Sequence, residues 1–219
     1  MVGGRISKKS FMTFSIVASN PSTKELCVAT STGLIAVGNL VPSILPNVGA
    51  ICVQAMVKPS YRETILDLMK NGSSNESAIN NVLKNDKKKE HRQIIVVNAN
   101  GQAYVFSGQR MINICDSCME DNFAIAGNKL ASTSVIFSMK TAFLKNANIF
   151  FPKRLLLTLI AGENAGGDKR GCMSAAIEYF KPNRRIMTLR TDYSNNPLKD
   201  LSMALEKRYS KECKDAFDR

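Results

Sequence analysis

Thr13 stands at the head of the first β-rich run of the sequence, directly after Met12. A threonine hydroxyl is a weak nucleophile until a base lies beside it. The α-amino group of a chain that began at Thr13 would be such a base, because its pKa would lie near 7.7–8.0. This chemistry needs no histidine, and the sequence contains only one.

In the chain as written, residues 1–12 block that amino group. Three explanations stay open. Translation could start at Met12, whose removal before a small residue would expose Thr13; residues 1–12 could be cleaved; or the protein could be non-catalytic. We favour the alternative start.

Two further patterns contain residues that could take part in chemistry, but both signals are weak. Cys115 and Cys118 have the spacing of a metal or redox pair, yet a zinc site needs a second pair of ligands. His91 lies in a charged run and is expected to be a solvated surface residue. We therefore expect loop cysteines and neither a metal nor another cofactor. The scattered cysteines predict free thiols in a reducing compartment, with the cytoplasm as the expected location.

A glycine-rich segment at 165–171 carries Asp168, Lys169 and Arg170. It precedes a predicted strand and lacks the Gly-Lys-Ser/Thr ending, so it is not predicted to be a phosphate-binding P-loop. Two interpretations remain. The segment is either a turn that carries exposed charged side chains or a loop that brings Asp168 and Arg170 into a cleft.

The charge balance favours anionic ligands, since 30 basic and 18 acidic residues give a formal net charge of +12. The basic residues cluster at 87–89, 184–185 and the C-terminal tail, without the interleaved aromatic residues of a base-stacking surface. Nucleic-acid binding is therefore not expected from this pattern. The longest apolar run, 155–161, is far shorter than the roughly 20 residues that a membrane-spanning helix needs, so no membrane partner is expected.

The elements that must position these residues are hairpins alternating with helices. Strands are predicted at 13–18, 26–31, 49–54, 93–98, 102–107, 123–126, 173–180 and 185–191, and helices at 61–70, from 73, at 133–144, at 152–163 and around 198–205. Ser73 and Glu76 predict a capping box, and Asn100-Gly101 predicts a type I′ turn. The short connections favour antiparallel sheets, so the predicted fold class is α+β. We expect an extension at 1–12, one domain at 13–210 and a basic tail at 211–219.

Several short segments occur in an order that resembles a known family. They lie at 13–18, 36–38, 41–42, 54–55, 92–93, 127–131, 165–171 and 174–176. Together they resemble the bacterial family called domain of unknown function 1028, which is grouped with the N-terminal-nucleophile (Ntn) hydrolases. The resemblance covers residues 12 to about 209, and Gly-Gly-Asp-Lys-Arg-Gly at 166–171 is its most specific part.

The resemblance implies an Ntn-hydrolase-like four-layer αββα sandwich, in which two antiparallel sheets lie face to face with helices outside. It also implies an amide-bond hydrolase acting on a small-molecule or peptide-like substrate, with Thr13 as nucleophile and, once unmasked, as base. The further catalytic candidates are Asn128 as an oxyanion donor, and Asp168 and Arg170 as a charge pair. The substrate-binding candidates are Ser31, Gln54, Tyr61, Lys169 and Ser174.

The sequence departs from the family pattern at several positions. Residues 58–62 replace Asn-Pro-x-Tyr-Gly, Ser132 stands where glycine is usual, and Met173 where glutamine is usual. These changes could retune the substrate towards anions or mark a lost activity. The alternative function is therefore a non-catalytic binding or scaffolding protein that holds an anionic small molecule, with Lys58 and Arg62 nearby. We leave a homo-oligomeric assembly open.

Overall fold

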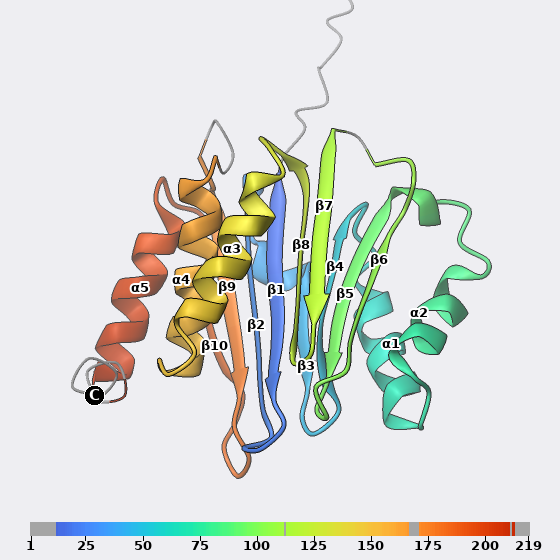
Figure 1. Ribbon diagram of the computed structural model, residues 1–219, viewed down its shortest axis with the longest axis horizontal. Coiled ribbons are helices and arrows are strands. Elements are labelled where there is room, and N and C mark those ends of the chain that lie inside the picture. Colours follow the sequence, from blue (N-terminus) through green and yellow to red (C-terminus); the bar gives the residue numbers. More distant parts are fainter. Residues whose placement is uncertain (1–11, 112, 167–170, 211, 213–219) are drawn as a thin grey trace, which may run out of the picture.

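Two antiparallel β-sheets packed face to face, with α-helices on both outer faces, form the protein (Figure 1). The computed structural model describes residues 12–111, 113–166, 171–210 and 212. The six-stranded sheet has the order β10-β9-β2-β1-β8-β7, with β1 (Thr13–Asn20), β2 (Glu25–Thr32), β7 (Ile114–Glu120), β8 (Phe123–Leu130), β9 (Ser174–Phe180) and β10 (Met187–Thr191). The four-stranded sheet has the order β3-β4-β5-β6, with β3 (Pro42–Leu45), β4 (Gly49–Ala55), β5 (Arg92–Asn98) and β6 (Ala103–Ser107).

The helices divide between the two outer faces. Those that cover the six-stranded sheet are α3 (Ser134–Lys145), α4 (Phe151–Asn164) and α5 (Pro197–Arg208), and those that cover the four-stranded sheet are α1 (Ser60–Lys70) and α2 (Asn75–Leu83) (Figure 1). Short 3-10 helices lie at η1 (Val37–Asn39) and η2 (Lys89–His91). The predicted α+β class with two antiparallel sheets is thereby confirmed. In the described part of the chain, every helix is too short or too polar to cross a membrane.

Strand alternation distributes the side chains of β1 between two hydrophobic layers. Phe14 and Ile16 pack beneath the helices, whereas Val17 lies between the two sheets. All three are fully buried, and burial of each such side chain contributes about 1.5–3 kcal/mol. Because both faces of β1 are covered, its sequence shows a nearly continuous buried run. The positions that alternate with Phe14 and Ile16 therefore face the other sheet.

The turn between β5 and β6 differs from the predicted type I′ turn. Of its two central residues only Gly101 has a positive φ, 93°. The Gly101 amide donates to the Asn98 carbonyl at 3.0 Å, and the Asn98 side-chain oxygen accepts from the amides of Asn100 and Gln102. The Asn98 side chain therefore stabilises a longer connection, in which residues 98–102 join the paired residues Val97 and Ala103.

Two strands were not predicted, and one helix cap was misplaced. The four-residue β3 follows a proline-containing loop, and β7 is a polar, half-exposed edge strand, so neither has a clear alternating pattern. The prediction that Cys115 and Cys118 lie in a loop is wrong, since both belong to β7. The N-cap of α2 is Ser74 rather than Ser73, and its side chain accepts from the amide of Ser77.

Candidate functional site

The space between the two sheets is polar at one end and apolar at the other. The polar end is the upper end in Figure 1, where β1 begins and β2 and β8 end. Its side chains come from five strands, are at most 7% exposed, and belong to Thr13, Ser15, Thr30, Thr32, Gln54, Gln93 and Asn128. Further down the same strands, apolar residues such as Val17 and Val28 replace them. These residues form a buried cluster of polar side chains, the polar chamber, at one end of an otherwise hydrophobic layer.

Thr13 pairs in register with Thr32 on one side and with Asn128 on the other. Its hydroxyl oxygen lies 3.0 Å from that of Thr32, and the Thr32 hydroxyl donates to the Met12 carbonyl at 2.7 Å. Because the Thr32 hydroxyl has a single hydrogen, Thr13 must be the donor in the bond between them. The Thr13 hydroxyl is therefore held in one orientation.

Two glutamines connect the sheets beside Thr13. Gln54 Nε2 donates to Gln93 Oε1 at 2.7 Å and to the Ala126 carbonyl at 3.2 Å. The same Gln93 oxygen accepts from Asn128 Nδ2 at 3.2 Å, while Gln93 Nε2 lies 3.3 Å from the Gly127 carbonyl. Buried amide groups that satisfy one another in this way hold their side chains in place.

The hydroxyl pair below Thr13 extends this network. Ser15 Oγ lies 2.7 Å from Thr30 Oγ1 and 2.7 Å from Gln54 Oε1. Among the described residues, no charged side chain forms a hydrogen bond with these hydroxyl and amide groups. These uncharged hydroxyl and amide groups therefore bind one another, and the described side chains supply no general base to them.

The thiol of Cys115 lies at this chamber, with its Sγ 3.1 Å from Gln93 Nε2. The fully buried thiol of Cys52 also lies there, beside Ser15. Burial raises the pKa of the Cys115 thiol, so the neutral form dominates near neutral pH. Cys118 lies on the opposite face of β7, because residues three apart on a strand point in opposite directions. There, burial raises the pKa of Cys118 to about 11. The pair therefore cannot act as one redox or metal site, and the described residues contain no cluster of three or more His, Cys, Asp or Glu residues suited to a metal ion.

Three of the predicted site residues come together, namely Thr13, Gln54 and Asn128. Two others form a clamp beside them: Ser31 Oγ donates to the Ser174 carbonyl at 3.3 Å, and Ser174 Oγ accepts from the Val37 amide at 3.1 Å. Both serines are fully buried, so this clamp fixes the loop after β2 and has no free surface for a substrate.

Tyr61 is not brought to the chamber. It projects from α1 on the outer face of the four-stranded sheet, and its hydroxyl donates to Asp86 Oδ2 at 3.0 Å. Arg92 forms an ion pair with Asp86 and holds the pKa of that carboxyl well below its usual range. The group formed by Tyr61, Asp86 and Arg92 therefore stabilises the fold.

The predicted site residues Asp168, Lys169 and Arg170 lie outside the described residues.

The sequence interpretation missed four members of the chamber, Ser15, Thr30, Thr32 and Gln93. The available signal was alternation, since Gln93 shares its face of β5 with the apolar Ile95 and Val97. A polar residue at such a position must have a buried partner, because an unpaired polar group in the core is costly. Alternation does not identify that partner, which lies on the other sheet.

Comparisons with known proteins identify the family of the chain and a solved structure of the same fold. The model of a family described as "Family of unknown function (DUF1028)" matches residues 13–201, which confirms the family resemblance. The crystal structure of protein SPO2555 from Silicibacter pomeroyi, from the same family, is 33% identical, covers 93% of this chain and 89% of its own, and superposes with a TM-score of 0.85. No curated protein matches the chain.

Proposed function

Since the chain belongs to the DUF1028 family, whose function is unknown, we propose that it is an Ntn amidohydrolase in which Thr13 attacks an amide carbonyl. The observation that carries the proposal is the position of the Thr13 hydroxyl, at the start of β1 and hydrogen-bonded within a chamber of uncharged polar groups. The two face-to-face antiparallel sheets support the corresponding Ntn-hydrolase-like αββα sandwich. The family match also begins at Thr13.

In the proposed reaction the α-amino group of an N-terminal Thr13 accepts the hydroxyl proton. The threonine oxygen then bonds to the substrate's carbonyl carbon, the amide C–N bond breaks, and the leaving amine takes the proton from the ammonium group. Water hydrolyses the resulting threonine ester with the same amino group as base. Asn128 Nδ2 donates one hydrogen to Gln93, so its second hydrogen remains as a candidate donor to the oxyanion.

The environment of Met12 supports cleavage as one route to that N-terminus. The Met12 carbonyl accepts from Thr32 Oγ1 at 2.7 Å and from the Gly33 amide at 3.4 Å. Two donors on this oxygen would stabilise the charge that develops if the Thr13 hydroxyl attacked the Met12 carbonyl carbon. That attack would transfer the acyl group from nitrogen to oxygen, free the α-amino group, and leave an ester for water to hydrolyse. A start at Met12 followed by its removal would expose the same residue.

Intact-mass analysis of protein without an N-terminal tag tests the proposal. We expect a mature chain that begins at Thr13, and we expect Thr13→Ala to reduce amide turnover by on the order of 10³-fold or more. Thr13→Ser, which keeps a hydroxyl, should retain part of the activity. If the Thr13→Ala variant retains residues 1–12, self-cleavage produces the N-terminus of the wild type. If the variant also lacks these residues, a start of translation at Met12 explains the short chain. Amide turnover by a chain that retains residues 1–12 would overturn the proposal.

A non-catalytic binding protein is the second candidate, favoured by the buried Met12 side chain, which is 2% exposed in the uncut chain. Lys58 and Arg62, the cations suggested to lie near an anionic ligand, already have partners within the protein. Arg62 donates to the Pro42 carbonyl, and Lys58 lies over the Tyr61 ring. A ligand that raises the melting temperature of wild type and Thr13→Ala equally, with no amide turned over by either, would favour binding.

A further inference from the structure

A large hollow lies at the opposite end of the molecule from Thr13. The β1–β2 turn, the β7–β8 turn and the connection between α3 and α4 surround it, and its volume is about 920 Å³. Small-molecule sites commonly have about 300–1,000 Å³. Thr13 is the first residue of β1, and Asn20, which lines the hollow, is the last. The length of the strand, roughly 23 Å, therefore separates the hollow from the proposed active site.

Aromatic rings form one wall of the hollow. The rings of Phe123 and Phe143 are nearly fully buried and lie with their centroids 4.6 Å apart. Phe150 is half-buried and packs edge-on against Tyr179, with the centroids 5.7 Å apart. Together with the half-buried Phe151, it leaves apolar surface on the hollow. Rings held by such packing can receive a ligand with little loss of side-chain entropy.

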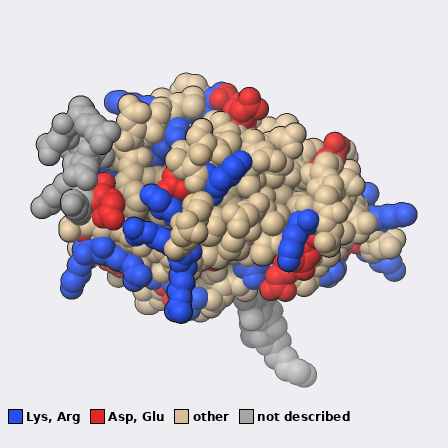
Figure 2. Space-filling model, turned by 90° about the horizontal axis from the view of Figure 1, so that it is seen from below, with Lys and Arg blue, Asp and Glu red and all other residues tan. Residues whose placement is uncertain are grey.

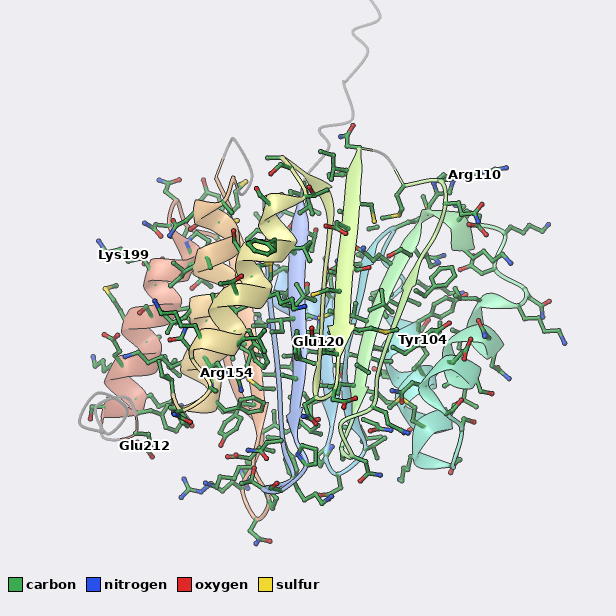
Figure 3. The ribbon with its side chains drawn as sticks, in the orientation of Figure 1. Tyr104, Arg110, Glu120, Arg154, Lys199 and Glu212 are labelled. Atoms are coloured by element: carbon green, nitrogen blue, oxygen red, sulfur yellow. The ribbon has the colours of Figure 1, made fainter. Side chains whose placement is uncertain are left out.

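Arg154 provides a cation on the same wall (Figure 3). Its Nε donates to the Phe143 carbonyl at 2.7 Å, and its guanidinium carbon lies 3.6 Å from the centroid of the Phe143 ring. Partial burial lowers the pKa of Arg154 to about 10, so it remains charged at neutral pH. Within the described ranges, no Asp or Glu forms an ion pair with it. Most of its N–H donors therefore remain available to a ligand.

The carboxylates that also line the hollow do not neutralise this guanidinium. Glu120 is ion-paired with Lys140, and Glu25 lies 3.7 Å from the ammonium group of Lys181. Asp121 is exposed at the β7–β8 turn. Among the charged residues that line the hollow, Arg154 is thus half-buried and has no opposite charge beside it.

The N-terminus of α4 adds positive potential at this wall. Its N-cap residue, Phe150, provides no side-chain hydrogen bond, and the first turn contains no acidic residue. Lys153 and Arg154 instead place positive charges near the positive end of the helix dipole. Glu206 lies 3.8 Å from the ammonium group of Lys153, whereas no Asp or Glu of the described residues pairs with Arg154.

Figure 2 views this end of the molecule and shows Lys and Arg side chains over it, with Asp and Glu side chains among them. A smaller hollow of about 70 Å³ adjoins the large one, since both are lined by Phe150 and Lys181. Arg184, Arg185 and Glu212 also line the smaller hollow.

We propose that the large hollow binds a small organic carboxylate with an aromatic or branched apolar body. Arg154 holds the carboxylate through its planar N–H donors, and Phe150 and Phe151 contact the apolar body. The inference is independent of any amidohydrolase activity, because it uses no residue of the Thr13 chamber.

Calorimetric titration of the full chain with 3-phenylpropionate and its neutral analogue 3-phenylpropionamide tests this site. We expect the acid to bind about tenfold more tightly than the amide, or better, since only the acid makes a charge-assisted pair. Arg154→Met, which keeps an apolar stem, should weaken binding of the acid by about tenfold or more, whereas Arg154→Lys should retain part of it. Lys199→Met, on the exposed face of α5, makes the same change in net charge and should leave binding unaltered (Figure 3).

Equal affinity for the acid and the amide would overturn the proposal, as would full affinity in a folded Arg154→Met variant. Absence of saturable binding for a panel of aryl and branched carboxylates up to about 10 mM would do the same. If Arg154→Met fails to fold, the contrast between acid and amide in the wild type and in Arg154→Lys still decides the question.

Discussion

At the scale of single residues, the buried carboxylate of Asp86 connects neighbouring segments of the fold. The side chains of Asp86 and its partner Arg92 are 7% and 6% exposed. The Lys88 amide and the Tyr61 hydroxyl also donate to Asp86, while Arg92 donates to the Met56 carbonyl. The pair thereby ties the segment before β5 to the end of β4 and to α1.

We predict that Asp86→Ala lowers the free energy of unfolding by about 3–5 kcal/mol, because Arg92 would be left buried without a counter-charge. The pKa of Asp86 is lower in the folded than in the unfolded state, so its contribution is present above the ordinary value of 3.8 and is lost as the pH falls below it. Urea unfolding at several pH values measures this. The gap between wild type and variant should narrow below about pH 3.8; a gap that stays constant on acidification would contradict the prediction. Asp67→Ala, at an exposed position on α1, is the control and should change stability by at most about 0.5 kcal/mol.

At the scale of elements, the start of α2 shows how a local signal can be displaced by one residue. Ser74 has the extended backbone of an N-cap, with φ −64° and ψ 157°, and its hydroxyl accepts from the Ser77 amide at 3.2 Å. Glu76, assigned to the predicted capping box, instead accepts from the Tyr104 hydroxyl at 3.3 Å. Its partner is thus in another element, which the spacing of residues 73–76 could not indicate.

Alanine at each serine tests the position of the cap. Ser74→Ala should lower the free energy of unfolding by about 1 kcal/mol, because the Ser77 amide loses its partner. Ser73→Ala, at the neighbouring position, should change it by no more than about 0.5 kcal/mol. Thermal unfolding of both variants gives the comparison, and a larger loss for Ser73→Ala would show that the cap is misassigned.

At the scale of the whole molecule, the two sheets are joined differently at their two ends. Apolar packing connects them at the end that carries the large hollow, whereas hydrogen bonds cross between them at the Thr13 end. Gln54 and Gln93 come from one sheet, and their partners Ser15, Ala126 and Asn128 come from the other. A polar chamber can persist between two sheets because these amides satisfy one another.

A double-mutant cycle on the glutamines measures this cross-sheet network. Gln93→Leu should cost about 2–4 kcal/mol in the free energy of unfolding, since it leaves the amides of Gln54 and Asn128 without their shared acceptor. The double variant with Gln54→Leu should cost less than the sum of the single changes, by about 0.5–3 kcal/mol. Urea unfolding gives the three values, and additivity within about 0.5 kcal/mol would show that the two residues act independently. Gln102→Leu, at an exposed position, is the control.

Sequence alone determined the features that depend on neighbouring residues. Long periodic segments predicted most helices and strands, and the placement of Thr13 at the head of β1 followed from one β-rich run. Turn residues were also informative. Pro182-Asn183 predicted a hairpin, and Asn183 has a positive φ of 63° in the connection between β9 and β10. These features were predictable because periodicity and turn geometry act over a few residues.

Which residues meet depends on how the two sheets pack against each other. Gln93 became a centre of the chamber because the packing of the two sheets places it beside Asn128, and Tyr61 was separated from the chamber because a whole sheet intervenes. The hollow beside Arg154 is likewise formed by segments far apart in the chain. The partner of a strand residue depends on pairing register and on the stacking of sheets, which are non-local properties that no single segment encodes.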